Sequence, residues 1–283
     1  MIPQILVNGV LVSLTYIIMA LGFTLIFGIM RIVNFAHGEF YMFGAFALMI
    51  LFDQVGLPFF AAVLISGVLT AALGMLCERL LFRRLVGEEL PGMITALALS
   101  IILQSVALLM FGPADQSVAR PYVGTWPIFG AVVPWDRTVV AIGAVLILTA
   151  FYLFMKFSRL GLAMRAVALD PEVSGLMGVE PGLIYSTAFG LASLLAGLAG
   201  ALMAPVYTVG PAMGALPMLK AFVVVILGGL GSIPGAVLGG VILGLTDSVL
   251  ATMLDSTVAS IASFVVVLGV IVARPTGLLG RSI

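Results

Sequence analysis

The chain alternates long apolar runs with short polar connections from its first residues to its last. A helix that crosses a bilayer needs about 20 predominantly apolar residues. The runs that meet or approach this length are 4–28, 39–53, 58–77, 93–111, 138–155, 183–204, 217–230, 233–252 and 258–273. The second and the seventh of these runs are short. The pattern therefore predicts an all-α polytopic membrane helix bundle with eight or nine spans, some short or interrupted, built as a single transmembrane domain over residues 1–283.

Composition agrees with this pattern and excludes several classes of function. The 283 residues are 63% hydrophobic and 8% charged, whereas a soluble domain has about 25% charged residues. The net charge of zero gives no electrostatic reason to expect a nucleic-acid partner. A single cysteine, Cys77, excludes an internal disulfide and a multi-cysteine metal site. We expect no metal site and no catalytic residues.

The distribution of basic residues predicts the orientation in the membrane. Cytoplasmic loops of membrane proteins carry an excess of lysine and arginine. With the predicted spans, nine of the 12 basic residues fall on one side, and three fall on or near the other: Arg120, Arg137 and Lys220. This asymmetry predicts an N-terminus outside the cell and a C-terminus in the cytoplasm.

The longest polar stretches are two connecting segments, which the orientation places on opposite sides. Segment 112–137 is the predicted outer loop, and its Trp126 and Trp135 are typical of a membrane–water interface. Segment 156–182 is the predicted cytoplasmic loop. In it, Asp170 followed by Pro171 predicts a helix N-cap with proline at the first helical position. A short helix displayed there could dock a soluble partner, although spacing alone favours a solvated connector.

Glycine and polar residues interrupt two of the apolar runs, one early and one late in the chain, at 27–46 and 226–244. Interrupted segments in corresponding halves of a transporter point to a site near the membrane midplane. The candidate pathway or gate residues in these segments are Asn34, His37, Glu39, Gly231 and Ser232.

The early interruption contains the ionisable residues that are most difficult to place. Ionisable groups at membrane depth are costly and usually functional. Arg31 is expected to lie in the turn between the first two spans. For His37 and Glu39, a place in the turn and a place along a pathway remain equally open.

Small residues recur at a spacing of four along the later spans, which lets helices pack closely. The pairs and triplet are Gly231/Gly235/Gly239, Gly240/Gly244, Ser193/Gly197 and Ala196/Gly200.

Two charged residues, Lys220 and Asp247, lie within or near the late apolar runs. We expect Lys220 to extend toward the outer interface and Asp247 to face the bundle interior, with pairing between them left open.

Four sequence stretches resemble a known family. They are GIMRIVNFAHGEFYMFGA, GLAMRAVALDPEVSGLMGVEP, VVVILGGLGSIPGAVLGGVILG and the ending RPTGLLGR. In this order they are similar to the permease subunits of high-affinity branched-chain amino-acid ABC importers, of the LivH type. The stretches are specific to this group of permeases and less specific for substrate, because importers of urea and short amides have similar permeases.

The resemblance implies a transport subunit of a bacterial plasma (inner) membrane importer that is not itself an enzyme. The implied partners are a second related permease, two cytoplasmic ATPase subunits that use ATP, and an extracytoplasmic substrate-binding protein. No cofactor is expected on this chain. The residues implied to couple it to the ATPases are Arg165, Asp170, Pro171, Glu172 and Gly178.

Two other classes of function compete with this reading. A self-sufficient ion-coupled carrier would need buried relays, for which Glu39 and Asp247 are few. An intramembrane enzyme would need Ser232 and His37 to act together, and nothing in their spacing supports that.

Overall fold

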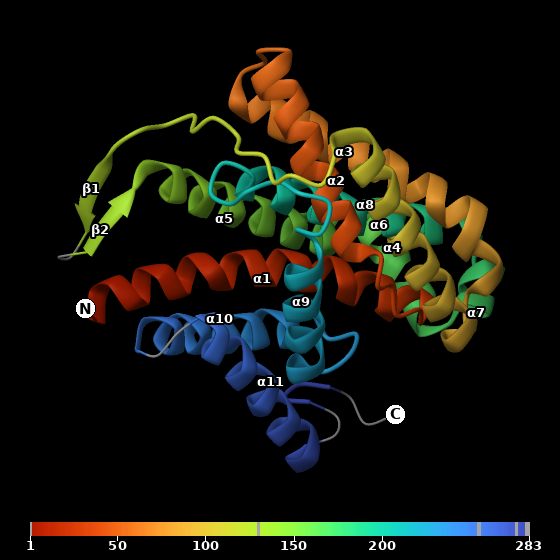
Figure 1. The fold of residues 1–283 in the computed structure, drawn as a ribbon. Coiled ribbons are helices and arrows are strands. Elements are labelled where there is room, and N and C mark those ends of the chain that lie inside the picture. Colours follow the sequence, from red (N-terminus) through yellow and green to blue (C-terminus); the bar gives the residue numbers. More distant parts are fainter. Residues whose placement is uncertain (1, 129–130, 254–255, 275–276, 281–283) are drawn as a thin grey trace.

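The computed structural model describes residues 2–128, 131–253, 256–274 and 277–280, and Figure 1 shows its arrangement of helices. The α-helices are α1 (Ile2–Met30), α2 (His37–Met49), α3 (Phe59–Cys77), α4 (Glu89–Phe111), α5 (Trp135–Phe157), α6 (Arg159–Leu169), α7 (Pro171–Leu176), α8 (Pro181–Met203), α9 (Ala215–Gly228), α10 (Ile233–Met253) and α11 (Ser256–Ala273). Short helices of other pitch are η1 (Ile50–Gln54), η2 (Glu78–Phe82) and η3 (Arg83–Leu85), and the strands are β1 (Thr125–Ile128) and β2 (Ala131–Pro134).

Each of the nine predicted apolar runs is helical in the structure. Helices satisfy their own backbone hydrogen bonds, which is what a lipid environment requires. By length and composition, six helices among the described residues can cross a membrane, namely α1, α3 with its continuation to Leu85, α4, α5, α8 and α10. Helix α2 has 13 residues and α9 has 14. The polytopic helical bundle is therefore confirmed, while the total of eight or nine crossings stays a prediction.

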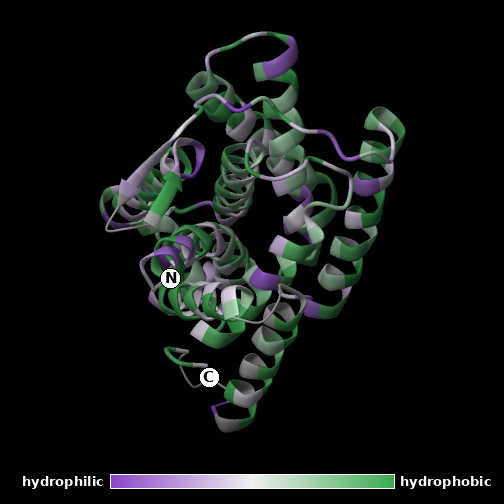
Figure 2. Cartoon of the chain, turned by 60° about the vertical axis from the view of Figure 1, so that its left-hand side comes forward, coloured by the Kyte–Doolittle hydropathy of each residue, from purple (hydrophilic) through white to green (hydrophobic). Residues whose placement is uncertain are grey.

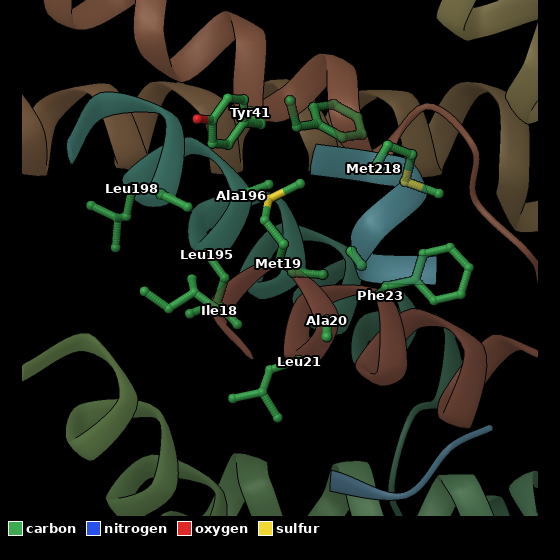
Figure 3. Packing of buried hydrophobic residues seen from close by; sticks show 14 of the residues in the cluster. Ile18, Met19, Ala20, Leu21, Phe23, Tyr41, Leu195, Ala196, Leu198 and Met218 are labelled. Carbon is green, nitrogen blue, oxygen red and sulfur yellow. The ribbon is translucent and has the colours of Figure 1, made fainter. Parts of the chain in front are cut away.

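Helices α1 and α8 form the centre of the bundle. Their most apolar windows are 72% and 83% buried, compared with 17% for α4 and 22% for α5. Figure 3 shows apolar side chains of α1, among them Met19 and Phe23, lying among residues of α2, α8 and α9. Helices α4 and α5 lie at the periphery, and Figure 2 shows that apolar residues, drawn green, predominate along the helices with hydrophilic residues between them. Such outward apolar faces suit contact with lipid.

The regularly spaced small residues hold the central helices at close range. A Cβ on Gly200 would collide with the carbonyl oxygen of Tyr41, and one on Gly244 would collide with Ser13. The antiparallel pair α1 and α10 approaches closely from Gly9, where a Cβ would collide with Leu245, to Gly28, which lies at van der Waals distance from Gly231 in the turn before α10. The predicted close packing is confirmed, and the two interrupted segments meet at this last contact.

The predicted cytoplasmic loop is mostly helical, which corrects its description as one polar loop with one short helix. Ser158 is the N-cap of helix α6, and its Oγ accepts a hydrogen bond from the Gly161 backbone N–H at 2.8 Å. Met164 and Val167 are buried on its inner face. The sequence pattern predicted no helix here, and apolar side chains lie on its exposed side as well, at Leu160, Leu162 and Leu169. Burial against the bundle stabilises what the local pattern does not.

The predicted outer loop forms a small hairpin. Strands β1 and β2 are antiparallel, and the rings of Trp126 and Trp135 stack with centroids 5.2 Å apart. The hairpin lies beside the start of α1, where the Val132 N–H donates to Gln4 Oε1 at 3.0 Å. In Figure 1 this end of the bundle is opposite the end that carries α7.

Candidate functional site

A cavity of about 380 Å³ opens between the N-terminal half of α1 and the region where α8 ends and α9 begins. Its lining residues are Asn8, Leu11, Val12, Thr15, Tyr16, Tyr41, Arg137, Val140, Met203, Val206, Tyr207, Thr208, Ala212, Met213, Leu216, Pro217 and Lys220. The cavity belongs to the half of the bundle that carries the hairpin, because none of its α1 residues lies beyond the middle of that helix.

The periodicity of α1 explains how one helix supplies much of the wall. Asn8, Val12 and Tyr16 are four residues apart, so they lie on one face of the helix. On the opposite wall, α8 ends at Met203 and α9 starts at Ala215. The helix end and helix start that line the cavity carry partial charges of opposite sign.

The lining combines aliphatic side chains with hydroxyls and cations. The charged members of the described lining are Arg137 and Lys220. Arg137 is half-buried and donates through Nη1 to Asn8 Oδ1 at 3.2 Å. A pocket with a mostly apolar wall and a few placed polar groups is the usual form of a small-molecule site.

Lys220 belongs to a buried network that ties three helices together. Its Nζ lies 2.9 Å from Asp247 Oδ2 and 3.1 Å from Oδ1. The hydroxyl of Tyr16 donates to the same carboxylate at 2.8 Å. Lys220 is 2% exposed and Asp247 is 8% exposed. Asp247 therefore faces the interior as predicted, whereas the expectation that Lys220 extends to the outer interface is wrong, because this carboxylate holds it inside.

The early interruption turns back into the bundle. Arg31 is exposed in the turn after α1, as predicted, with a left-handed φ of 54°. Six residues later His37 begins α2 beside the middle of α1, and its Nε2 lies 3.2 Å from the carbonyl oxygen of Met19. Helix α2 thus starts within the bundle and not at its surface.

Asn34, His37 and Glu39 are all buried, with exposures of 1%, 0% and 2%. Asn34 Oδ1 accepts from the Ala36 N–H at 3.0 Å. Glu39 Oε1 accepts from Ser100 Oγ at 2.9 Å and from Gln104 Nε2 at 2.8 Å. Each of these three side chains also has one buried polar atom without a hydrogen-bond partner among the described residues. They do not line the 380 Å³ cavity, and their role as a pathway or gate stays a prediction.

Gly231 and Ser232 form the tight turn between α9 and α10. Gly229 and Gly231 both have positive φ, at 103° and 79°, a conformation that favours glycine. Ser232 Oγ accepts from the Gly235 N–H at 3.2 Å, so Ser232 caps α10. The Leu278 N–H donates to the carbonyl of Leu227 at 2.9 Å, which brings the C-terminal segment onto the same turn.

The residues that the resemblance assigns to coupling lie on and around α6 and α7. The Asp170 carboxylate accepts from the N–H groups of Glu172 and Val173, both at 2.9 Å, and Pro171 is the first helical residue. The predicted N-cap is thus confirmed. Gly178 has a φ of 85° and ends this unit. Arg165 donates to the Met155 carbonyl oxygen and so ties α6 to α5.

Helix α7 presents apolar side chains outward. Val173, Leu176 and Met177 are 55%, 87% and 81% exposed, and Leu169 just before the helix is 77% exposed. This segment lies outside the membrane-spanning helices. Several exposed apolar side chains close together in sequence and outside the membrane-spanning helices are typical of a protein-interaction surface.

Sequence reasoning missed the cavity, and above all its hydroxyl groups on Tyr16, Tyr41 and Tyr207. One signal was present in the sequence. The polar members of the first apolar run, Asn8, Thr15 and Tyr16, share a helix face, which indicates that this face is not turned to lipid.

The comparison with known proteins decides the family. The sequence matches the model of the branched-chain amino acid transport system / permease component over residues 5–273. The chain belongs to this family. Such a permease component is a transport subunit, which agrees with a multi-pass membrane protein built around an internal cavity.

Individual branched-chain permeases match the chain over nearly its whole length. It is 33% identical to the high-affinity branched-chain amino acid transport system permease protein LivH of Escherichia coli K12, over 98% of this chain and 95% of that protein. It is 34% identical to the corresponding protein BraD of Pseudomonas aeruginosa, with the same coverage. Permease protein LivM of Escherichia coli is 26% identical over 94% of this chain and 68% of its own length.

A solved structure shares the fold. PsaBC from Streptococcus pneumoniae in complex with Fab matches with a TM-score of 0.50 and 16% identity, over 94% of this chain and 91% of that chain. At this identity the likeness concerns the path of the chain alone.

Proposed function

We propose that this chain is the membrane-spanning permease subunit of an ATP-driven ABC importer that moves branched-chain amino acids across the bacterial plasma membrane. The observation that carries the proposal is the end-to-end match to permeases named for branched-chain amino acids. The cavity supports it, because its aliphatic wall suits a hydrophobic side chain and its cations suit a carboxylate.

ATP hydrolysis belongs, in this proposal, to two separate cytoplasmic ATPase subunits that dock on α6 and α7. The exposed apolar side chains of Leu176 and Met177 supply the contact. The Asp170 N-cap and Pro171 stabilise α7 as a helix when the ATPase subunits move it. Glu172, exposed in the first turn of α7, adds a negative charge beside them. This chain supplies no catalytic group and needs no cofactor of its own.

A second related permease completes the translocation path. Support comes from Escherichia coli, whose LivH and LivM are both named permease proteins of a high-affinity branched-chain amino acid transport system and both resemble this chain. The substrate-binding protein docks at the opposite end from α7, beside the hairpin and the cavity. Lipid surrounds the outward apolar faces of α4 and α5.

The proposed orientation places the N-terminus outside and the C-terminus in the cytoplasm. Arg83, Arg84 and Arg159 belong to the end that carries α6 and α7, where Arg83 Nη2 also donates to the Gly182 carbonyl at 3.0 Å. The excess of basic residues at this end indicates the cytoplasmic side.

The experiment that tests the proposed assembly is purification of the tagged chain from native membranes in mild detergent, followed by mass spectrometry. We expect a second permease and ATPase subunits in stoichiometric amounts. Recovery of this chain alone, under conditions that preserve other importers, would contradict the assembly and favour a self-sufficient carrier.

A further inference from the structure

We propose that the cavity binds the amino acid as a zwitterion, with Lys220 receiving its α-carboxylate and the aliphatic wall receiving its side chain. The inference rests on the proposed function, which it deepens by assigning a binding site and the chemical groups recognised there. Neither the family description nor the names of the relatives places a substrate on any residue.

The size and lining of the cavity set the class of ligand. A volume of about 380 Å³ lies within the range of roughly 300–1,000 Å³ for small-molecule sites. It admits a single amino acid. Leu11, Val140 and Met213 are among the aliphatic residues of the wall, so a branched aliphatic side chain finds apolar contacts that urea or acetamide could not use.

The charges of the lining favour a carboxylate. Lys220 is 2% exposed and lines the cavity, and a charge at such a depth interacts more strongly than one in water. Lys220 lies one helical turn after Leu216, in the N-terminal half of α9, and this helix start is itself favourable for an anion. The C-terminal end of α8 at Met203, which also lines the cavity, has the polarity that favours an ammonium group.

Asp247 and Tyr16 act as positioning residues. Asp247 holds Lys220 Nζ at 2.9 Å, and Tyr16 holds the carboxylate of Asp247 at 2.8 Å. The buried pair is neutral as a whole. A zwitterion adds no net charge to the cavity, whereas a carboxylic acid without an ammonium group would leave the C-terminal end of α8 without the cation that its polarity favours. An amino acid amide would keep an acceptor oxygen but lack the negative charge that strengthens a hydrogen bond from Lys220. The site therefore selects for both charged groups together.

The direct test is protection of a cavity thiol in the complete transporter. Because the chain has one cysteine, Cys77, a Cys77→Ala background can carry either Met213→Cys or Thr208→Cys, both in the lining. We expect leucine to slow alkylation of either thiol at least five-fold. Leucinamide, 4-methylpentanoate and acetamide should leave the rate unchanged. The control is Val123→Cys, which is 86% exposed and outside the lining, and leucine should not affect it.

A second measurement separates binding by Lys220 from a merely structural role of the ion pair. The double variant Lys220→Met/Asp247→Asn removes both charges together and leaves Tyr16 an amide oxygen to donate to. We expect this variant to assemble, to lose protection of the cavity thiol by leucine, and to import leucine at least ten-fold more slowly. Protection and import equal to those of the parent would overturn the role of Lys220.

The outcomes distinguish this inference from the function on which it rests. A parent complex that imports leucine with ATP but shows no protection at either cavity thiol would contradict the inference alone. A parent complex that imports no branched-chain amino acid would contradict the proposed function. Protection by acetamide or leucinamide equal to that by leucine would overturn recognition of the carboxylate.

Discussion

Individual glycines decide how closely the central helices approach. Replacing Gly200 by alanine would place a Cβ against the carbonyl oxygen of Tyr41, and neither backbone can move away within the packed core. We expect Gly200→Ala to destabilise the protein by about 1–3 kcal/mol, measured as a lower midpoint of thermal unfolding in detergent. Gly175→Ala is the control, because a Cβ there meets nothing within 4 Å. An equal effect of both substitutions would contradict the close-packing account.

A conservative substitution of the buried Glu39 separates the effect of its charge from the effect of its hydrogen bonds. Its Oε1 accepts from Ser100 and Gln104, and a glutamine at this position would keep an acceptor oxygen. We expect Glu39→Gln to preserve stability, and Glu39→Leu to lower it by about 1–3 kcal/mol because the two donors lose their partner. Thermal unfolding checks both variants. If Glu39→Gln is stable but abolishes uptake, its charge has a function in transport.

Helix α7 carries the exposed apolar side chains that we propose contact the ATPase subunits. Leu176 and Met177 contribute little to folding, since both are more than four-fifths exposed. We expect Leu176→Ser/Met177→Ser to change stability by less than about 0.5 kcal/mol while weakening retention of the ATPase subunits, measured by co-purification. Full retention would show that the subunits dock elsewhere.

The charges at the start of α7 allow a separate test of coupling. Lysines in place of Asp170 and Glu172 would remove the cap and reverse the charge beside the positive end of the helix dipole. We expect this double variant to insert in the membrane, to lose uptake, and to retain ATP hydrolysis. Glu88→Lys, on the connection before α4, is the matched control. Full uptake by the double variant would contradict the coupling assignment.

Much of the element pattern could be predicted from the sequence, and the reason is local. An apolar run of about 20 residues satisfies all its backbone hydrogen bonds within itself when it is helical, and all nine runs are helical. Asp170 and Pro171 specified the start of α7 through the backbone groups next to them. Helix α6 was missed because its stability comes from Met164 and Val167 packing against the bundle.

The cavity could not be predicted because it depends on residues far apart in the chain. Tyr16 and Asp247 are 231 positions apart and meet only after α1 and α10 pack against each other. The contact between Lys220 on α9 and Asp247 on α10 reversed the expectation for Lys220, since a lysine near an interface extends outward unless a carboxylate lies inside. The early polar segment was ambiguous for the same reason, because only the fold shows that α2 begins beside Met19.

For the whole molecule, the two ends of the bundle should be reachable from opposite sides of the membrane. Val123 and Leu176 are exposed residues at these two ends. Each would be replaced by cysteine, one at a time, in the Cys77→Ala background. In intact cells we expect a membrane-impermeant thiol reagent to label Val123→Cys and to label Leu176→Cys only after permeabilisation. The reverse pattern would invert the orientation and, with it, the assignment of α7 to the cytoplasm.

Transport by the reconstituted complex is the most direct test of the central claim. The chain would be placed in liposomes with its co-purified permease, ATPase subunits and binding protein, and uptake of radiolabelled leucine would be followed with ATP supplied on the ATPase side. The account predicts uptake that requires ATP and is competed by isoleucine and valine but not by urea or acetamide. Uptake driven by an ion gradient without ATP, or uptake of the amides in place of leucine, would contradict it.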